Sequence, residues 1–417
     1  MKNSQIYQSY MYSYPHKTAY RELTDIQYSR VRNFLDKKNF SLYFHVPFCR
    51  TKCGYCNLFS VTEKREDYFS QYLGAMYKQI KQYSVADKKF QSIIFGGGTP
   101  LILSPENLER LLQIAPHLKS SNSCIETSPN DTTAEKLEIL QKYNIDRVSI
   151  GVQSFIDSEL NTLKRAHQVD SARKALSLIK TYNFDCVNID LIYGIPGQTV
   201  ESFAFSLKSA LEYSPDELFL YPLYIRKGTE LFGNVTNEDT QRIYFFARDY
   251  LLSNGYNQIS MRQFAKKKPE NITSCGFENM LSIGCGGRSY FGNLHFCSPY
   301  ATDRSACVRL IDNYIHSTDK TQILHGFILN QDEQKRRFII KNLLCFKGIS
   351  LSDYANIFNS SALEDFELLN ELISNSYAEI KENFITLTPL GMSISDYIGP
   401  MFISDAVNEK MNEWTPI

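Results

Sequence analysis

Three cysteines lie within eight residues of one another in the stretch FHVPFCRTKCGYCNLFS, residues 44–60. Cys49, Cys53 and Cys56 follow a C-x3-C-x2-C spacing. Cysteine thiolates bind soft metal ions and iron–sulfur clusters, so this spacing indicates a metal centre. A structural zinc ion takes four protein ligands, usually including a second Cys or His pair. A ferredoxin cluster also takes four thiolates, so three cysteines leave one position open.

The other cysteines do not repeat this pattern and lie singly along the chain. They are Cys124, Cys186, Cys275, Cys285, Cys297, Cys307 and Cys345. A [4Fe–4S] cube held by three thiolates keeps one iron free for a small molecule. We therefore predict that Cys49, Cys53 and Cys56 bind such a cluster. A zinc site and three unrelated core cysteines are the alternatives.

Composition and charge are typical of a globular protein with one large domain and one smaller domain. The chain has 417 residues and is 43% hydrophobic, which is enough for a large core. The 45 basic and 45 acidic side chains balance, which argues weakly against a general nucleic-acid binder. No apolar run approaches the roughly 18 residues of a membrane span, and the polar, aromatic N-terminus does not resemble a signal peptide. We expect a cytoplasmic protein whose thiols stay reduced.

From about residue 41 the sequence alternates short β-rich runs with longer helical stretches. The expected strands cover residues 41–48, 91–100, 124–128, 147–155, 186–194, 217–225 and 256–264. The expected helices cover residues 64–83, 104–118, 133–143, 170–182, 199–213 and 239–254. This alternation predicts an α/β fold with a parallel sheet, and the absence of a Rossmann fingerprint favours a partial or full β/α barrel. The candidate motifs follow strands, where such barrels place their chemistry.

Beyond about residue 320 the alternation stops. Two helical stretches are followed by a short hairpin and a helix within AEIKENFITLTPLGMSISDYIGPMF, which predicts a small winged-helix-like α+β domain. We therefore expect four parts of the chain. They are an N-terminal strap or lid (1–40), a barrel core (41–265), a barrel-closing and substrate-lining segment (266–320) and a C-terminal accessory domain (321–417).

The cysteine motif and its place directly after the first expected strand resemble the radical S-adenosylmethionine (SAM) superfamily. The hallmark of that superfamily is C-x3-C-x2-C just after the first barrel strand. The stretch YFHVPFCRTKCGYC is similar to the oxygen-independent coproporphyrinogen III oxidase branch. That branch also includes heme chaperones, heme-degrading relatives and methyl- or cyclopropane-forming enzymes. The resemblance covers roughly residues 40–265, with a weaker match at LTPLGMSISDYIGPMF. It implies a [4Fe–4S] cluster, one or two SAM molecules, and SAM chelating the fourth iron.

The glycine run GGGTP, residues 96–100, follows an expected strand. Glycine lets a backbone approach a ligand closely, although a tight turn is the alternative explanation. In the family this motif lines the SAM amino group. The resemblance therefore implies SAM contacts from Gly96, Gly97, Gly98 and Thr99.

Further polar residues at or near strand ends match SAM-binding positions of the family. By this resemblance Glu126 accepts hydrogen bonds from the SAM ribose, Gln153 contacts SAM, and Arg165 pairs with the SAM carboxylate. Asp190 is an acid among apolar residues and needs a partner when buried, and the family uses it near SAM. Tyr43 matches a tyrosine close to the cluster. A structural salt bridge is the alternative for each of the charged residues.

Cations in the second half of the barrel are candidates for substrate binding. MRQFAK (261–266) resembles the segment that lines the second SAM or substrate cavity of the oxidase, and SIGCGGRSYFGN (282–293) carries an arginine in a glycine-rich turn. A substrate with propionate groups would need such cations, although solvated or core-paired arginines are equally expected. The candidate substrate or second-SAM residues are Arg226, Met261, Arg262, Phe264 and Arg288.

One position departs from the family pattern. Coproporphyrinogen oxidases carry a further cysteine two residues after the third ligand, and heme chaperones carry an aromatic residue there. This chain has Leu58. It therefore matches neither subtype, which argues against decarboxylation of coproporphyrinogen.

The resemblance implies an enzyme that cleaves SAM reductively to a 5′-deoxyadenosyl radical, which abstracts hydrogen from an organic substrate. The expected partners are that small molecule and a reductant such as flavodoxin or ferredoxin, without nucleic acid. Three outcomes stay open. They are oxidative decarboxylation or another reaction on a tetrapyrrole, radical methylation or cyclopropanation of another substrate with two SAM molecules, and heme carriage by a chaperone of the same fold.

Overall fold

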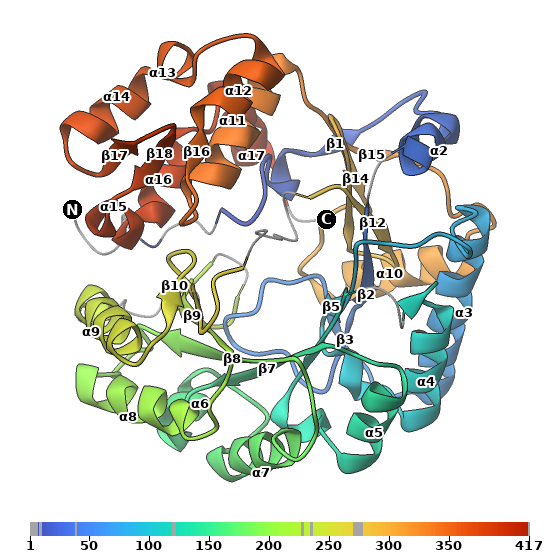
Figure 1. The fold of residues 1–417 in the computed structure, drawn as a ribbon. Helices are drawn as coiled ribbons and strands as arrows, with labels where there is room; N and C mark the ends of the chain where they lie inside the picture. The colour runs from blue at the N-terminus through green and yellow to red at the C-terminus, as the bar shows by residue number, and fades with distance from the viewer. Residues whose placement is uncertain are drawn as a thin grey trace.

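A curved sheet of thirteen strands organises most of the chain (Figure 1). The computed structural model describes residues 7, 11–37, 40–118, 122–226, 229–233, 237–269 and 278–415. Within these residues the strand order is β1-β15-β14-β13-β12-β2-β5-β6-β7-β8-β9-β11-β10. Because the outermost strands β1 and β10 pair with other strands and not with each other in this order, the described barrel is open. The partial β/α barrel predicted from the sequence is confirmed.

Seven neighbouring strands of the sheet run parallel. They are β12 (Met280–Ile283), β2 (Ser41–Val46), β5 (Ser92–Gly97), β6 (Asn122–Thr127), β7 (Arg147–Gln153), β8 (Cys186–Tyr193) and β9 (Glu217–Pro222). From β2 to β9 they follow chain order. Parallel neighbours need crossover connections, and helices supply them here. Those helices are α3 (Glu66–Gln82), α4 (Pro105–Ile114), α5 (Ala134–Lys142), α6 (Asp157–Thr162), α7 (Val169–Ile179) and α8 (Val200–Leu211).

Antiparallel strands extend the sheet on both sides. Beyond β12 lie β13 (Arg288–Phe291), β14 (Leu294–Cys297), β15 (His325–Ile328) and β1 (Arg21–Glu22). Beyond β9 lie β11 (Gln263–Ala265) and β10 (Asn257–Gln258). The remaining elements here are α2 (Tyr28–Lys37), β3 (Phe48–Cys49), β4 (Val61–Thr62), α9 (Thr240–Ser253) and α10 (Arg304–His316).

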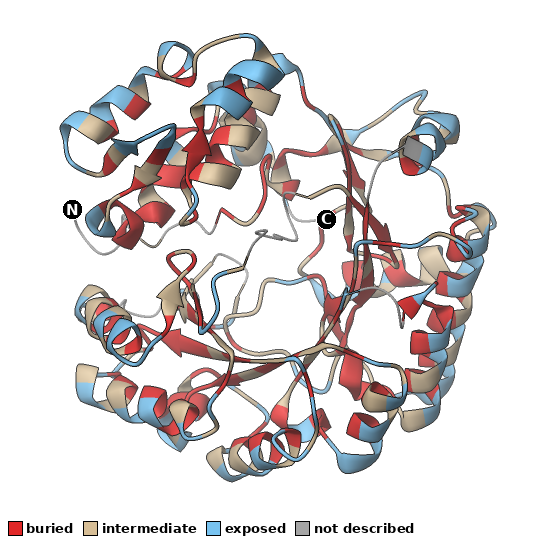
Figure 2. Cartoon of the chain, in the orientation of Figure 1, coloured by how far each residue is buried: buried red, intermediate tan, exposed pale blue. Residues whose placement is uncertain are grey.

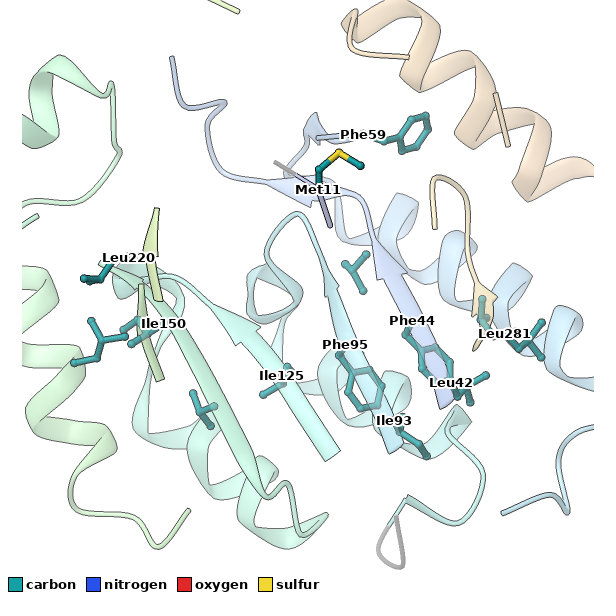
Figure 3. Packing of buried hydrophobic residues seen from close by; sticks show 14 of the residues in the cluster. Met11, Leu42, Phe44, Phe59, Ile93, Phe95, Ile125, Ile150, Leu220 and Leu281 are labelled. Atoms are coloured by element: carbon teal, nitrogen blue, oxygen red, sulfur yellow. The ribbon is translucent and has the colours of Figure 1, made fainter. Parts of the chain in front are cut away.

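The hydrophobic core lies between the sheet and the helices that cover it, and the helices expose their outer faces (Figure 2). Phe44 on β2 stacks on Phe95 of the neighbouring β5, with ring centroids 5.0 Å apart. Figure 3 shows this pair beside Leu42 and Ile93, which are fully buried. Parallel strands covered on one face by helices are apolar over most of their length. The packed strands therefore form a rigid frame, and their carboxyl ends share one edge.

A smaller unit follows the barrel in the chain, at the upper left of Figure 1. Its antiparallel sheet has the order β16-β18-β17. Its elements are α11 (Gln331–Leu343), β16 (Ile349–Ser350), α12 (Leu351–Phe358), α13 (Ala362–Asp365), α14 (Glu367–Ser374), β17 (Ala378–Lys381), β18 (Phe384–Leu387), α15 (Pro389–Ser393), α16 (Ser395–Met401) and α17 (Asp405–Glu413). The hairpin and helix predicted for residues 378–402 are therefore present.

Polar contacts at two buried carboxylates help to join this unit to the rest of the molecule. The guanidinium of Arg262, beside β11, forms an ion pair with Asp396 on α16, and both side chains are almost fully buried. The Tyr224 hydroxyl donates to the same carboxylate. The Tyr14 hydroxyl, from the N-terminal segment, donates to Glu333 on α11. The segment predicted as a strap thus lies against the C-terminal unit, although its residues 1–6, 8–10 and 38–39 are outside the described part.

The single strand expected over residues 256–264 is instead a hairpin of β10 and β11. The turn between them forms at Ser260, whose hydroxyl accepts hydrogen bonds from the backbone N–H groups of Arg262 and Gln263. Serine side chains commonly replace a backbone acceptor in this way and break strand pairing. Among the helices that the structure describes, none is long and apolar enough to cross a membrane.

Candidate functional site

A cavity of about 420 Å³ lies at the carboxyl ends of the parallel strands. Its wall combines the loop between β3 and β4 with residues at or after the ends of β5, β6, β7, β8 and β9. These predicted site residues line it: Cys49, Cys53, Cys56, Gly97, Gly98, Thr99, Glu126, Gln153, Arg165, Asp190 and Arg226. Residues far apart in the sequence meet there because parallel strands end at one edge.

The other predicted residues are outside this wall as the structure describes it. They are Tyr43, Gly96, Met261, Arg262, Phe264 and Arg288. Met261 and Phe264 are fully buried in the hydrophobic core, and Arg262 is paired with Asp396. The substrate or cofactor contacts expected of these residues therefore stay predictions.

The loop that carries the three cysteines is anchored across the cavity. The backbone N–H of Gly54 donates to the carbonyl of Leu163 at 3.0 Å, and the Gly54 carbonyl accepts from the N–H of Leu231 at 2.9 Å. A turn brings the Cys56 N–H to the Cys53 carbonyl at 3.1 Å. Backbone bonds on both sides of Gly54 thus hold the loop against the far side of the barrel.

The three thiols lie at the cavity wall without a metal-ligand group around one point in the described part of the chain. Among the described residues, no three His, Cys, Asp or Glu side chains group closely enough to hold a single metal ion. The thiolates of a cube bind different irons and need not converge on one point, so the cluster and the zinc alternative both stay predictions. Burial, followed by the neighbouring Cys56, raises the pKa of Cys49 to about 12. Cluster binding through Cys49 would therefore release its thiol proton. Cys275 is outside the described residues.

Arg165 connects the cysteine loop to the end of β7. Its Nη1 donates to the Sγ of Cys53 at 3.1 Å and its Nη2 donates to the Gly151 carbonyl at 2.7 Å. Its Nε is buried and has no hydrogen-bond partner among the described residues. A buried guanidinium donor without an acceptor is costly, so this side chain has a donor to spare for a ligand.

Gln153 ends β7 in a strained conformation. Its φ of +72° lies in the left-handed region, which side chains other than glycine seldom adopt. The side chain is 9% exposed, and its Oε1 has no hydrogen-bond partner within the described chain. Strain of this kind concentrates at ligand sites. Gln153 therefore presents an unused acceptor at the cavity.

Glu126 and Asp190 are two of the three carboxyl groups that line the cavity among the described residues, and the third, Asp131, forms an ion pair with Arg50. Glu126 accepts a hydrogen bond from the Gly97 N–H at 3.2 Å, and Asp190 accepts one from the Asn188 side chain at 2.7 Å. Burial is the main cause that raises the pKa of Glu126 to about 7, and the charge of Asp190 adds to it. Burial likewise raises the pKa of Asp190 to about 6. A ligand that donates hydrogen bonds to these groups would stabilise their ionised forms.

Contacts within the protein explain the glycines at the end of β5 and directly after it. A Cβ at Gly98 would lie 2.4 Å from the Phe48 carbonyl oxygen, and one at Gly97 would lie 2.7 Å from the His45 ring. Gly97 also has a φ of +113°, which side chains rarely allow. The tight turn weighed as the alternative is thus present, while the SAM contact stays a prediction.

Several wall residues were not predicted from the sequence. They are Tyr12, Lys17, Tyr55, Tyr221 and Tyr224. Tyr55 lies between Cys53 and Cys56, and only this position in the sequence could have indicated that it lines the cavity. Tyr12 and Lys17 come from the N-terminal segment, where no periodic pattern points to a cavity that the barrel builds.

Comparison with known proteins identifies the relatives of this chain. A model of the radical SAM superfamily matches residues 43–210, and one of the HemN C-terminal domain matches residues 329–394. The heme chaperone HemW of Lactococcus lactis is 26% identical over 90% of this chain and 100% of its own length. The heme chaperone HemW of Haemophilus influenzae is 31% identical over 59% of this chain and 69% of its own length.

Oxidases are also among the similar proteins. The oxygen-independent coproporphyrinogen III oxidase of Escherichia coli is 26% identical over 92% of this chain and 91% of its own length. The solved structure of the coproporphyrinogen III oxidase HemN from Escherichia coli superimposes with a TM-score of 0.78, covering 94% of this chain and 96% of that one at 23% identity. The cofactors expected from the sequence, a [4Fe–4S] cluster and SAM, are those of the radical SAM superfamily. The chain therefore belongs to that superfamily, in the branch that contains the HemN oxidases and the HemW chaperones.

Proposed function

We propose that Cys49, Cys53 and Cys56 hold a [4Fe–4S] cluster and that SAM binds beside it in the cavity. One observation carries the proposal: the three thiols, the carboxyl groups of Glu126 and Asp190 and the Arg165 guanidinium share one cavity at the strand ends. Two polar atoms at this wall, Arg165 Nε and Gln153 Oε1, have no partner within the described residues. SAM has both a carboxylate, which could accept from Arg165, and hydrogen-bond donors, which could pair with Gln153 Oε1. It therefore fits these side chains.

The residues around the cavity would bind and orient SAM. Arg165 would pair with its carboxylate, since a guanidinium and a carboxylate form charge-assisted hydrogen bonds. Glu126 would accept hydrogen bonds from the ribose, and Gln153 would contribute its free Oε1. When bound, the cluster and SAM supply reductive cleavage of SAM and hydrogen abstraction from the substrate. A reductant such as flavodoxin or ferredoxin would deliver the electron.

For the substrate, we infer an organic molecule with a tetrapyrrole as the leading candidate. The relatives that act on or carry tetrapyrroles match nearly the whole chain. Heme carriage is the second candidate function. Leu58 argues against the oxidase reaction but matches the chaperones no better. Leu58 lines the cavity and is 49% exposed, so an apolar side chain occupies the place where the oxidases have their extra cysteine.

Iron analysis after anaerobic reconstitution tests the cluster assignment. We expect about four irons and four sulfides per chain, and Cys53→Ala should abolish cluster binding. Cys186→Ala is the matched control, because Cys186 begins β8 at the opposite end from the cavity. Full iron loading of Cys53→Ala, or equal loss in both variants, would refute the assignment.

A further inference from the structure

Two cations from separate segments line the cavity beside the cysteines, and a third lies behind them. Lys17 belongs to a short 3-10 helix of the N-terminal segment, and Arg226 follows β9. Arg288 begins β13 and lies behind the wall, with its guanidinium 4.5 Å from the ring centroid of Tyr12. The charges of Arg288 and Arg226 both act on Lys17 and, together with burial as the main cause, lower its pKa well below the usual range. The three positive groups thus share one region.

The charge of Lys17 is not compensated by an acidic side chain. Lys17 is 8% exposed, and its ammonium has no ion pair or hydrogen bond among the described residues. Its contact is the face of the Tyr300 ring, 3.5 Å from the ring centroid. An ammonium over an aromatic face gains less than one paired with a carboxylate. An anion from outside the chain would stabilise the protonated form of a buried lysine that lines a cavity in this way.

Neither arginine forms an ion pair with an acidic side chain among the described residues. Arg288 donates from Nη1 to the Ser13 hydroxyl at 2.7 Å, and the described residues offer it no ion pair. Arg226 lies over the ring of Tyr224, 5.7 Å from its centroid, and likewise has no ion pair in the described part of the chain. Arg288 therefore holds the N-terminal segment by Ser13 and Tyr12, so that Lys17 faces the cavity.

We propose that Lys17 and Arg226 form an anion subsite that binds a carboxylate of the substrate, and that Arg288 positions Lys17 for it. This proposal rests on the proposed function in one respect, which is that the bound carboxylate belongs to the substrate. The carboxylate of SAM is the other possible source of an anion here. We assign the subsite to the substrate because SAM already has Arg165, and because exposed Leu58 on the same wall suits a molecule with apolar and acidic parts.

The chain contains its own reporter for this subsite. Its one tryptophan, Trp414, stacks on Tyr300 with ring centroids 5.0 Å apart. Lys17 contacts the same Tyr300 ring. An anion that moves the Lys17 ammonium would alter the surroundings of Tyr300 and Trp414. Binding can therefore be followed by tryptophan fluorescence and checked by calorimetry, without any turnover.

The test uses the full chain with its cluster and SAM, and glutarate as a small dicarboxylate probe. We expect saturable binding of glutarate and none of neutral glutaramide. Lys17→Met should weaken glutarate binding about 10-fold to 100-fold, as expected for loss of a charge-assisted contact. Lys17→Arg should retain it. Lys64→Met is the control, since Lys64 is an exposed lysine, and should bind glutarate like the wild type.

Three results would overturn the subsite. They are wild-type glutarate binding in Lys17→Met, equal binding of glutaramide, and a loss of SAM affinity in Lys17→Met that matches the loss for glutarate. Should Lys17→Met fail to fold, Arg226→Gln decides by the same criteria. A chain without SAM cleavage that still binds glutarate through Lys17 would refute the proposed function and leave the subsite intact. A chain that cleaves SAM but does not bind glutarate through Lys17 would refute the subsite alone.

Discussion

The guanidinium of Arg165 donates to the Cys53 sulfur at 3.1 Å, which links the end of β7 to the cysteine loop. The same side chain donates to the Gly151 carbonyl at 2.7 Å. One planar fork thus fixes the loop relative to the strand while its Nε stays unused. This geometry needs arginine, because an ammonium cannot reproduce the fork.

Replacing Arg165 with lysine should weaken SAM binding without removing the cluster. Lysine keeps the charge but loses the fork, so we expect the KM for SAM to rise about 10-fold to 100-fold. The three thiols remain, so iron content should stay near that of the wild type. Iron analysis and SAM-dependent kinetics measure the two effects separately. Loss of iron in Arg165→Lys would show that this residue is structural.

Glu126→Gln should stabilise the SAM-free protein at high pH. The pKa of Glu126 is raised to about 7 by burial and by Asp190, so the folded state binds its proton more tightly than the unfolded state. The contribution of this group to stability is therefore full below about pH 4.5 and falls as pH rises to about 7. At pH 8 the variant should be more stable by up to about 3 kcal/mol, and near pH 4.5 the two should be equal.

Thermal unfolding of the SAM-free chain at both pH values measures this difference. Glu106→Gln is the control, since Glu106 is an exposed glutamate on α4, and should leave the melting temperature unchanged at either pH. A variant at position 126 that is less stable than the wild type at pH 8 would contradict the argument.

Breaking the buried pair between Arg262 and Asp396 should destabilise the molecule strongly. The two side chains are 7% and 2% exposed, and removal of one partner leaves a buried charge without its counterion. Asp396→Ala should therefore lower the free energy of unfolding by about 3 to 5 kcal/mol. The double change Arg262→Met with Asp396→Leu should recover most of it. Denaturant unfolding tests this against Asp239→Ala, which removes an exposed pair and should cost less than about 1 kcal/mol.

Leu58 predicts slow or no conversion of coproporphyrinogen III to the divinyl product. The side chain lies on the cavity wall, half exposed, at the position where the oxidases are expected to have a cysteine. Product fluorescence measures porphyrin formation, and mass spectrometry detects methylated or cyclised products of other substrates. Rapid protoporphyrinogen formation by the wild-type chain would refute this argument and restore the oxidase reaction.

Local patterns in the sequence were enough to predict the barrel and the position of the cysteines. Short spacing places the three thiols on one loop, and the β/α alternation places Glu126 and Asp190 at strand ends. Both signals depend on neighbours in the chain, so they are readable without a structure. This is why the fold class agrees with expectation and most of the predicted residues of the first half, apart from Tyr43 and Gly96, line the cavity.

Contacts between distant segments could not be predicted in the same way. For Arg262, substrate binding and a core pair were both expected, and its partner Asp396, 134 residues further along the chain, could not be read from the local sequence. Lys17 carried no signal, because its environment comes from Tyr300 and Arg226. The strand expected over residues 256–264 is a hairpin because the Ser260 side chain forms a turn. Tertiary contacts decide the first two cases, and a local side-chain turn decides the third.

The most direct test of the central claim is formation of 5′-deoxyadenosine by the reconstituted chain with dithionite and SAM. We predict that the wild type and Cys186→Ala form it even without substrate, whereas Cys53→Ala does not. The claim requires the thiols and SAM to act in one cavity, so the product must depend on Cys53 and not on a thiol at the far end of β8. Absence of 5′-deoxyadenosine from a wild-type chain that holds four irons, or equal yields from Cys53→Ala, would contradict it.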